Sequence, residues 1–177
     1  MLTRADIEKY FTAEKQMALF FVVLGLLAVG LAVWFLFLQK NPVLKGMGLP
    51  FIVLGLLQAI AGYAVYQRSD KQRIDLVYAY DMNPSVLRQA ELPRMEKVNS
   101  RFGIFLAVEV ALLIAGVVLF FLYRQAPEKQ WFYGLGLGLL LQGLVMLAGD
   151  GFAFSRARTY TTALKTLLEK GRVQPQL

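Results

Sequence analysis

Four long apolar runs constrain this chain more than any other feature of its sequence. A helix needs about 20 apolar residues to cross the hydrocarbon core of a bilayer, and each run is close to or above that length. The first two runs carry no formal charge, the third carries only Glu109 and the fourth only Asp150. The sequence therefore predicts an all-α integral membrane protein, a four-helix bundle forming a single domain over residues 1–177. The predicted transmembrane helices are 17–38, 49–66, 102–123 and 131–154.

Short turns join the first run to the second and the third to the fourth. In the first turn, Asn41-Pro42 is expected to break the helix, and Gly46 and Gly48 to loosen the return. Pro50 then falls in the first turn of the second helix, where proline is tolerated. The runs are therefore predicted to pair into two tight helical hairpins.

The polar segment 67–101 joins the two hairpins. Asn83-Pro84 is expected to stop and restart a helix there, and Leu92-Pro93 to break it again. We therefore expect short amphipathic helices lying on the membrane in this linker. A polar and basic tail follows over residues 155–177.

The N-terminal segment is read as a retained interfacial helix over residues 3–16. Thr3 with Asp6 resembles a capping box, and apolar residues follow at approximately helical spacing. A cleavable signal would have a basic start followed by an apolar core, and this segment has acidic residues instead.

Lysine and arginine are distributed very unevenly between the two ends of the predicted hairpins. The segments before the first run, between the hairpins and after the last run hold 15 of these residues, and the two short turns hold 4. Since cytoplasmic loops are enriched in Lys and Arg, both termini and the linker are predicted to be cytoplasmic. The net charge of +7 is explained first by this bias, and nucleic acid is not expected as a partner.

The two hairpins carry matching residues at nearly constant offsets. Lys45 and Lys129 are 84 residues apart, as are Gln58 and Gln142. These matches predict a parallel internal duplication, with the alternative that apolar sequences match by accident.

Glu109 and Asp150 are the main candidates for chemistry within the membrane. Both fall in the cytoplasmic third of their helices, at comparable depth, where an ionisable group is costly and usually faces the bundle or a wet cavity. Together they could share a proton or hold a cation. The alternative is that Asp150 is interfacial and meets a neighbouring arginine, while Glu109 is paired structurally or reaches toward Arg101 or Lys97.

Gln58 and Gln142 lie near the middle of their helices and need hydrogen-bond partners there. They could line a polar pathway, but amides at such positions more often fasten helices together, so we predict that the two touch each other. Small residues at four-residue spacing are expected to bring helix backbones close: Gly134, Gly136, Gly138, Ala107, Ala111, Ala115, Gly55 and Ala59.

Basic residues next to the apolar runs are candidate contacts for anionic lipid: Arg68, Arg101, Arg156 and Arg158. The chain has no Cys and no His, which removes disulfides, thiolate or imidazole metal sites and Cys/His nucleophilic pairs. No cofactor and no enzymatic activity are expected.

The stretch from Tyr80-Asp-Met-Asn-Pro84 to Glu91-Leu-Pro-Arg-Met95 resembles the linker of small four-span bacterial membrane proteins of no known activity. The resemblance covers most of the chain and implies a bacterial inner membrane. Two function classes remain open. The first is a non-catalytic accessory, assembly or immunity-type protein that acts by binding a protein partner or a second copy. The second is a small proton or cation transporter or channel that uses Glu109 and Asp150.

Overall fold

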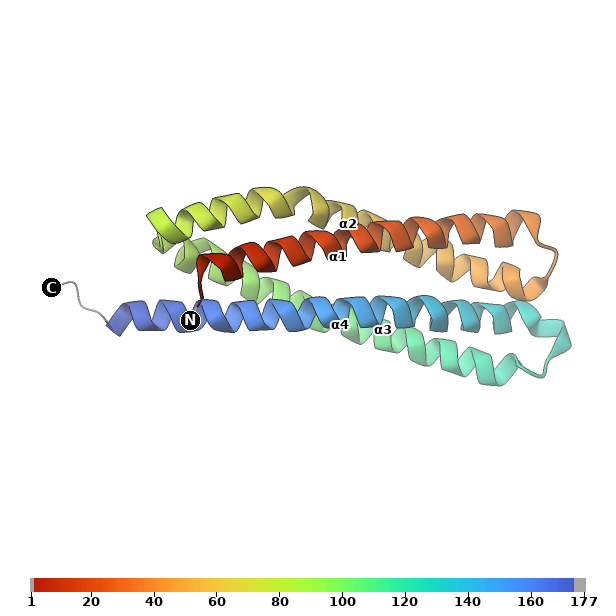
Figure 1. Cartoon of the computed structure of the whole chain (residues 1–177). Coiled ribbons are helices and arrows are strands. Elements are labelled where there is room, and N and C mark those ends of the chain that lie inside the picture. Colours follow the sequence, from red (N-terminus) through yellow and green to blue (C-terminus); the bar gives the residue numbers. More distant parts are fainter. Residues whose placement is uncertain (1, 174–177) are drawn as a thin grey trace.

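The computed structural model describes residues 2–173, with side chains to residue 169, and it is helical almost throughout (Figure 1). Two π-helical turns and one 3-10 turn interrupt or join the four long helices. The elements in chain order are α1 (Arg4–Val33), η1 (Trp34–Leu38, π), α2 (Pro42–Met82), η2 (Leu87–Glu91, π), α3 (Leu92–Tyr123), η3 (Pro127–Lys129, 3-10) and α4 (Gln130–Val173).

The helices form two hairpins that lie side by side along a common long axis (Figure 1). The hairpin turns lie at one end of the molecule, while the N-terminus and the turn between α2 and η2 lie at the other. The 41 residues of α2 and 44 of α4 correspond to about 60 and 65 Å at 1.5 Å per residue, roughly twice the thickness of a hydrocarbon core. The predicted four-helix bundle is confirmed, and it is much longer than four membrane crossings require.

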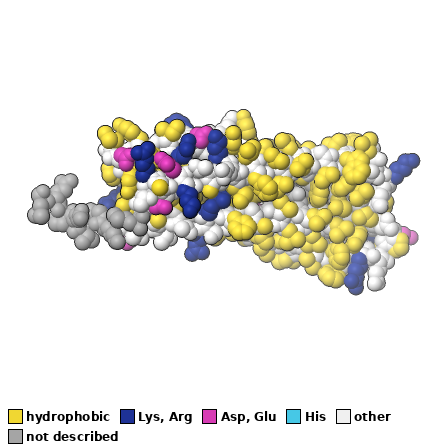
Figure 2. All heavy atoms as spheres, in the orientation of Figure 1, with side chains coloured by type: hydrophobic (Ala, Val, Ile, Leu, Met, Phe, Trp, Pro, Cys, Tyr) yellow, Lys and Arg dark blue, Asp and Glu magenta, His cyan; other side chains and the backbone are white. Residues whose placement is uncertain are grey.

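Each helix has an apolar and a polar stretch, and these stretches coincide along the bundle. The apolar half comprises residues 17–66 and 102–154, and the polar half comprises residues 2–16, 67–101 and 155–173. Four helices are long and apolar enough to cross a membrane. Figure 2 shows hydrophobic side chains covering the apolar half and charged ones gathered at the polar half, with a few more at the hairpin turns.

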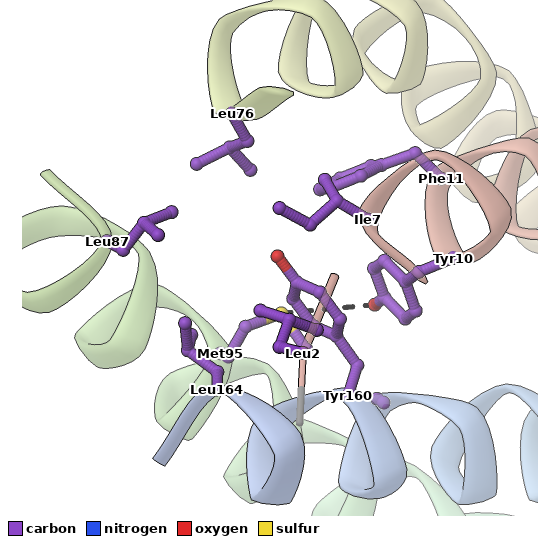
Figure 3. Close-up of a cluster of buried hydrophobic side chains, with 10 residues drawn as sticks. Leu2, Ile7, Tyr10, Phe11, Leu76, Leu87, Met95, Tyr160 and Leu164 are labelled. Carbon is purple, nitrogen blue, oxygen red and sulfur yellow. Dashed lines mark hydrogen bonds between the residues drawn. The ribbon is translucent and has the colours of Figure 1, made fainter. Parts of the chain in front are cut away.

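The polar half is a closed bundle with its own hydrophobic core (Figure 3). All four helices contribute to this core, and its largest fully buried side chains include Phe11, Leu87, Met95 and Leu164. Tyr10 of α1 stacks on Tyr160 of α4 with ring centroids 4.3 Å apart. The core members are Leu2, Ile7, Tyr10, Phe11, Leu76, Leu87, Met95, Ala157, Tyr160 and Leu164.

The apolar half is packed differently, as a row in which α2 and α4 are central and α1 and α3 are the outer helices. α1 packs along α2, α3 packs along α4, and α2 packs along α4. The closest backbone contacts are made by small residues: Gly25 approaches Gly55 and Ala59, and Gly116 approaches Gly136. Phe35 and Phe51 are buried, but many other large apolar side chains of this half are exposed, so water would be a poor solvent for its surface.

The predicted small-residue contacts are present on α4. Gly134 and Gly138 touch α2, and Gly136 touches α3, so successive glycines serve opposite neighbours. The predicted alanine series on α3, namely Ala107, Ala111 and Ala115, is exposed.

The linker between the hairpins differs from the prediction of short helices on a membrane surface. α2 continues without a break to Met82, and only the turn at Asn83-Pro84 falls where the sequence predicts a stop. Pro93 does not end the next helix, because the π-turn η2 directly precedes it and widens the backbone where proline cannot donate a hydrogen bond. The tail likewise continues α4 to Val173, and residues 174–177 lie outside the described residues.

The N-terminal segment begins with the predicted cap, but its place in the structure differs from the predicted interfacial helix. The capping box is confirmed: the Asp6 backbone N–H donates to Thr3 Oγ1, and the Thr3 backbone N–H donates to Asp6 Oδ2 at 2.9 Å. α1 then runs without interruption into the apolar half. Ile7 and Phe11 are buried in the polar core, so this stretch belongs to the bundle and is not an interfacial helix.

The first hairpin turn is shorter than predicted, since α2 starts at Pro42. Asn41 caps it, with its side chain accepting a hydrogen bond from the Val43 backbone N–H at 2.8 Å. Gly46 and Gly48 are helical and buried, and Pro50 is inside the helix rather than in its first turn. Their small size serves packing: an added side-chain carbon on Gly46 would meet the Trp131 backbone.

Candidate functional site

The deepest polar group of the apolar half is a pair of amides between the two central helices. Gln142 of α4 donates from Nε2 to Oε1 of Gln58 on α2 at 2.7 Å, and both side chains are buried. The predicted contact between them is therefore present. Each amide satisfies part of the other's hydrogen-bonding capacity, which is how amides fasten helices in an apolar environment.

A pair of carboxyl groups lies one level closer to the polar half. Glu109 of α3 is 4% exposed, and the half-buried carboxyl of Asp150 on α4 lies beside it. Two neighbouring carboxylates repel each other, and the repulsion is relieved when the pair shares a proton. Glu109 Oε2 is buried and has no hydrogen-bond partner among the described residues. The sequence predicts that these two residues act together, and the structure brings them together.

A third set of buried polar groups lies in the polar half and was not predicted. Glu91 is 2% exposed and accepts two hydrogen bonds from Arg94, at 2.7 and 2.8 Å. The Arg94 guanidinium also lies over the Phe11 ring, 5.6 Å from its centroid. Burial raises the pKa of the Tyr160 hydroxyl, and the facing Glu91 carboxylate raises it further.

Glu14 extends this set toward the apolar half. Its Oε2 lies 3.3 Å from the hydroxyl oxygen of the buried Ser69, which is closer, at 2.7 Å, to the Val65 carbonyl oxygen. The two acceptors therefore share one hydroxyl proton. Burial raises the pKa of the Glu14 carboxyl in spite of the nearby Arg68 and Arg94. Lys15, the next residue, instead faces the surface and pairs with Asp70.

The buried polar groups form three levels along α4, marked by Tyr160, Asp150 and Gln142. At 1.5 Å per residue these levels are about 15 and 12 Å apart. Beyond Gln142, toward the hairpin turns, the interface between α2 and α4 is filled by backbone contacts at Gly134 and Gly138. The series of buried polar side chains therefore begins in the polar half and extends about halfway through the apolar half.

A signal for the missed ion pair exists in the sequence. Leu87, Glu91 and Met95 are spaced by four residues, and all three are buried on one helix face. A charged residue between two apolar ones at this spacing indicates a buried, paired charge. The expectation of short surface helices assigned Glu91 to solvent and concealed this pattern.

The four arginines predicted as lipid contacts lie where the apolar half ends. Arg68 follows the apolar stretch of α2 and Arg101 precedes that of α3, both with exposed side chains. Arg156 is half-buried, while Arg158 is exposed and lies 5.5 Å from the Phe154 ring centroid. The four residues thus mark one level of the bundle.

Among the described residues there is no group of three or more carboxylates that could hold a metal ion. Comparison of the chain with protein-family models, with curated proteins and with solved structures finds no match. The function is therefore argued from the geometry of the chain alone.

Proposed function

We propose that this is a non-catalytic integral membrane protein that acts by binding a protein partner. Its apolar half would cross a bacterial inner membrane four times, and its polar half would project into the cytoplasm. The bias of Lys and Arg toward the polar end, 15 against 4, supports this orientation. The outward-facing large apolar side chains of the apolar half support insertion in lipid.

The observation that carries the binding function is an apolar stripe on α2 in the polar half. Ile74, Tyr78 and Met82 follow each other at four-residue spacing and are 62%, 65% and 68% exposed. They lie about 12 to 24 Å beyond Tyr66, the last residue of the apolar stretch of α2. Large apolar side chains grouped on a water-facing helix indicate a contact surface for another protein.

The charges beside this stripe favour a protein over an anionic lipid surface. Lys71 pairs with Asp75 at 2.6 Å, and Arg4 lies 3.6 Å from Asp81, so the flanks carry both signs. A membrane-binding face would be enriched in Lys and Arg alone. We expect the partner to present an apolar helix face with mixed charges at its edges.

Photo-crosslinking in living cells tests the proposed surface. A photoreactive amino acid at Tyr78 is expected to form an adduct with one protein partner, whereas the same amino acid at the exposed Thr159 of α4 is expected to form none. An adduct of twice the chain's mass would identify the partner as a second copy. Equal adducts at both positions would show that the stripe is not the contact surface.

The proposed orientation can be tested separately because the chain contains no native cysteine. Ser85→Cys is in the turn between the hairpins, and Gln125→Cys is in a hairpin turn. In intact spheroplasts a membrane-impermeant maleimide is expected to label the Gln125→Cys variant and not the Ser85→Cys variant. The reverse pattern would overturn the orientation.

A second function, proton or cation handling, is favoured by the carboxyl pair of Glu109 and Asp150. Oε2 of Glu109 is a buried hydrogen-bond acceptor with no donor among the described residues. Such an oxygen could take up an exchangeable proton or bind a cation. The backbone contacts at Gly134 and Gly138 lie between this level and the hairpin turns, so a continuous path would need another route or another subunit.

Proteoliposomes loaded with a pH indicator distinguish the two functions. If the carboxyl pair moves protons, the interior of vesicles with wild-type protein acidifies under an imposed proton gradient. The interior of vesicles with the Glu109→Gln or Asp150→Asn variant does not. If the protein acts by binding alone, vesicles with and without wild-type protein behave alike.

A further inference from the structure

A small pocket lies between α3 and α4 where the apolar half meets the polar half. Its volume is about 220 Å³. Its wall contains one aromatic ring, two cations and three uncharged polar side chains, from Phe154, Arg158, Lys165, Asn99, Thr161 and Thr162. The pocket is thus polar on the side of the polar half and aromatic on the side of the apolar half.

The charges at this pocket add up to one net positive charge. Arg158 is exposed, and its guanidinium carbon lies 5.5 Å from the centroid of the Phe154 ring. Lys165 lies 2.7 Å from Glu96 Oε1, so one of the two cations is balanced by a carboxylate. A ligand with a single negative charge would complete the balance.

Uncharged polar residues of the pocket wall are hydrogen-bonded to the chain itself. Asn99 Nδ2 donates to Thr161 Oγ1 at 2.8 Å, and Thr161 Oγ1 donates to the Ala157 carbonyl at 2.7 Å. These bonds hold the Asn99 amide in place, and its Oδ1 is covered by the protein and has no partner among the described residues.

We propose that this pocket binds the headgroup of an anionic phospholipid, with phosphatidylglycerol as the simplest case. The phosphate would lie at Arg158 and Lys165. This inference rests on the proposed insertion of the apolar half in a membrane, which places the pocket at headgroup level.

The position of the aromatic wall favours a lipid over free phosphate. Phe154 ends the apolar stretch of α4, and its ring lies 5.8 Å from that of Phe102, which begins the apolar stretch of α3. A lipid bound by its headgroup would lay its glycerol backbone and acyl chains on this surface. A free phosphate would leave it uncovered.

Titration of the full-length protein in non-ionic detergent with dioctanoyl phosphatidylglycerol tests the site. Arg158→Gln is expected to weaken binding about tenfold, as loss of a charge-assisted contact does, and Arg158→Lys is expected to retain most of it. The matched control is Arg101→Gln, which removes an exposed arginine at the same level outside the pocket and is expected to change binding less than about twofold.

Three outcomes would overturn the proposal. Equal weakening by Arg158→Gln and Arg101→Gln would show general attraction of anionic lipid to the basic level. Equal affinity for dioctanoyl phosphatidylethanolamine would remove the headgroup preference, and equal affinity for soluble glycerol 3-phosphate would identify a phosphate site without a lipid. Thermal unfolding of each variant establishes that it folds.

Carbonate extraction of native membranes separates this proposal from the proposed function. If wild-type protein stays in the membrane and binds no phosphatidylglycerol in the titration, only the headgroup site fails. If carbonate releases the protein, membrane insertion fails, and the headgroup proposal fails with it.

Discussion

Buried polar side chains in this bundle are matched in three different ways. The amides of Gln58 and Gln142 bond to each other, and the carboxyl groups of Glu109 and Asp150 can share a proton. Glu91 of the polar half is 2% exposed and is neutralised by Arg94. Because each arrangement depends on two residues, substitution of one residue leaves the other without its hydrogen-bond or charge partner.

Loss of the Glu91 carboxylate is predicted to be strongly destabilising. Glu91→Gln removes the anion from a buried ion pair and leaves the Arg94 charge against the core, which should lower the free energy of unfolding by about 3 kcal/mol. Denaturant or thermal unfolding in detergent measures this change. Glu96→Gln is the control, since its pair with Lys165 is about half exposed and should cost less than about 1 kcal/mol. Similar losses in the two variants would contradict the burial of the pair.

Removal of the Glu14 charge is predicted to stabilise the protein at higher pH. Burial raises the Glu14 pKa above its ordinary value of 4.5, so stability falls as the pH rises from 4.5 through the raised pKa. In Glu14→Gln the amide oxygen can still accept the Ser69 hydrogen bond and no charge is buried.

The melting temperature in detergent at several pH values tests this prediction. Glu14→Gln should melt at a higher temperature than wild type at pH 8, and the difference should disappear near pH 4.5. Glu8→Gln, which changes an exposed residue of the same helix, should show no such gain at pH 8. A pH-independent difference for Glu14→Gln would mean that the effect does not come from the carboxyl charge.

Between elements, the interface of α2 with α4 depends on the absence of side chains. A carbon added at Gly134 would collide with the Val43 backbone, whereas one added at Gly151, in the same helix, would meet nothing within 4 Å. Gly134→Ala is therefore predicted to lower the free energy of unfolding by about 2 kcal/mol, as overpacking does.

Gly151→Ala makes the same chemical change without the collision, and it should be neutral or stabilising by up to about 1 kcal/mol. Unfolding of both variants in detergent measures the contrast. Equal stability of the two variants would show that α2 and α4 can separate at Gly134 without cost.

The ends of helices were predictable from the sequence where an apolar run is followed directly by polar turn residues. The ends of the first and third runs, at Leu38 and Tyr123, match the ends of η1 and α3, because polar turn residues follow both. The starts and extensions of helices were less predictable. Gly46, Gly48 and Pro50 resemble turn residues, and only their contacts explain why they are helical.

Over the whole molecule, the two halves follow different packing rules within the same four helices. Large side chains fill the closed core of the polar half, whereas glycine and alanine make the closest backbone contacts in the apolar half, where many large side chains are exposed. Water drives large apolar groups together and lipid does not, which accounts for the difference if the apolar half lies in a membrane.

The candidate site was partly predictable at this scale. Glu109, Asp150, Gln58 and Gln142 are conspicuous because any polar residue in an apolar run must find a partner. Tyr10 and Glu91 lie in polar stretches, where a polar residue is ordinary, and both are buried. The spacing of Leu87, Glu91 and Met95 indicates the burial of Glu91, but spacing along one segment cannot report a contact such as that of Tyr10 with Tyr160.

The unbroken course of α2 and α4 through both halves fixes the rotation of one end relative to the other. Each residue in a helix turns the chain by about 100°, so one residue inserted between Phe154 and Tyr160 would swing the ring of Tyr160 away from Tyr10. Residues therefore cannot be inserted between the two halves in arbitrary number. Neither half can be exchanged for the matching part of another protein unless the rotation between the halves is kept. In evolution, the part of the chain that would meet lipid and the part that would meet a partner must change together.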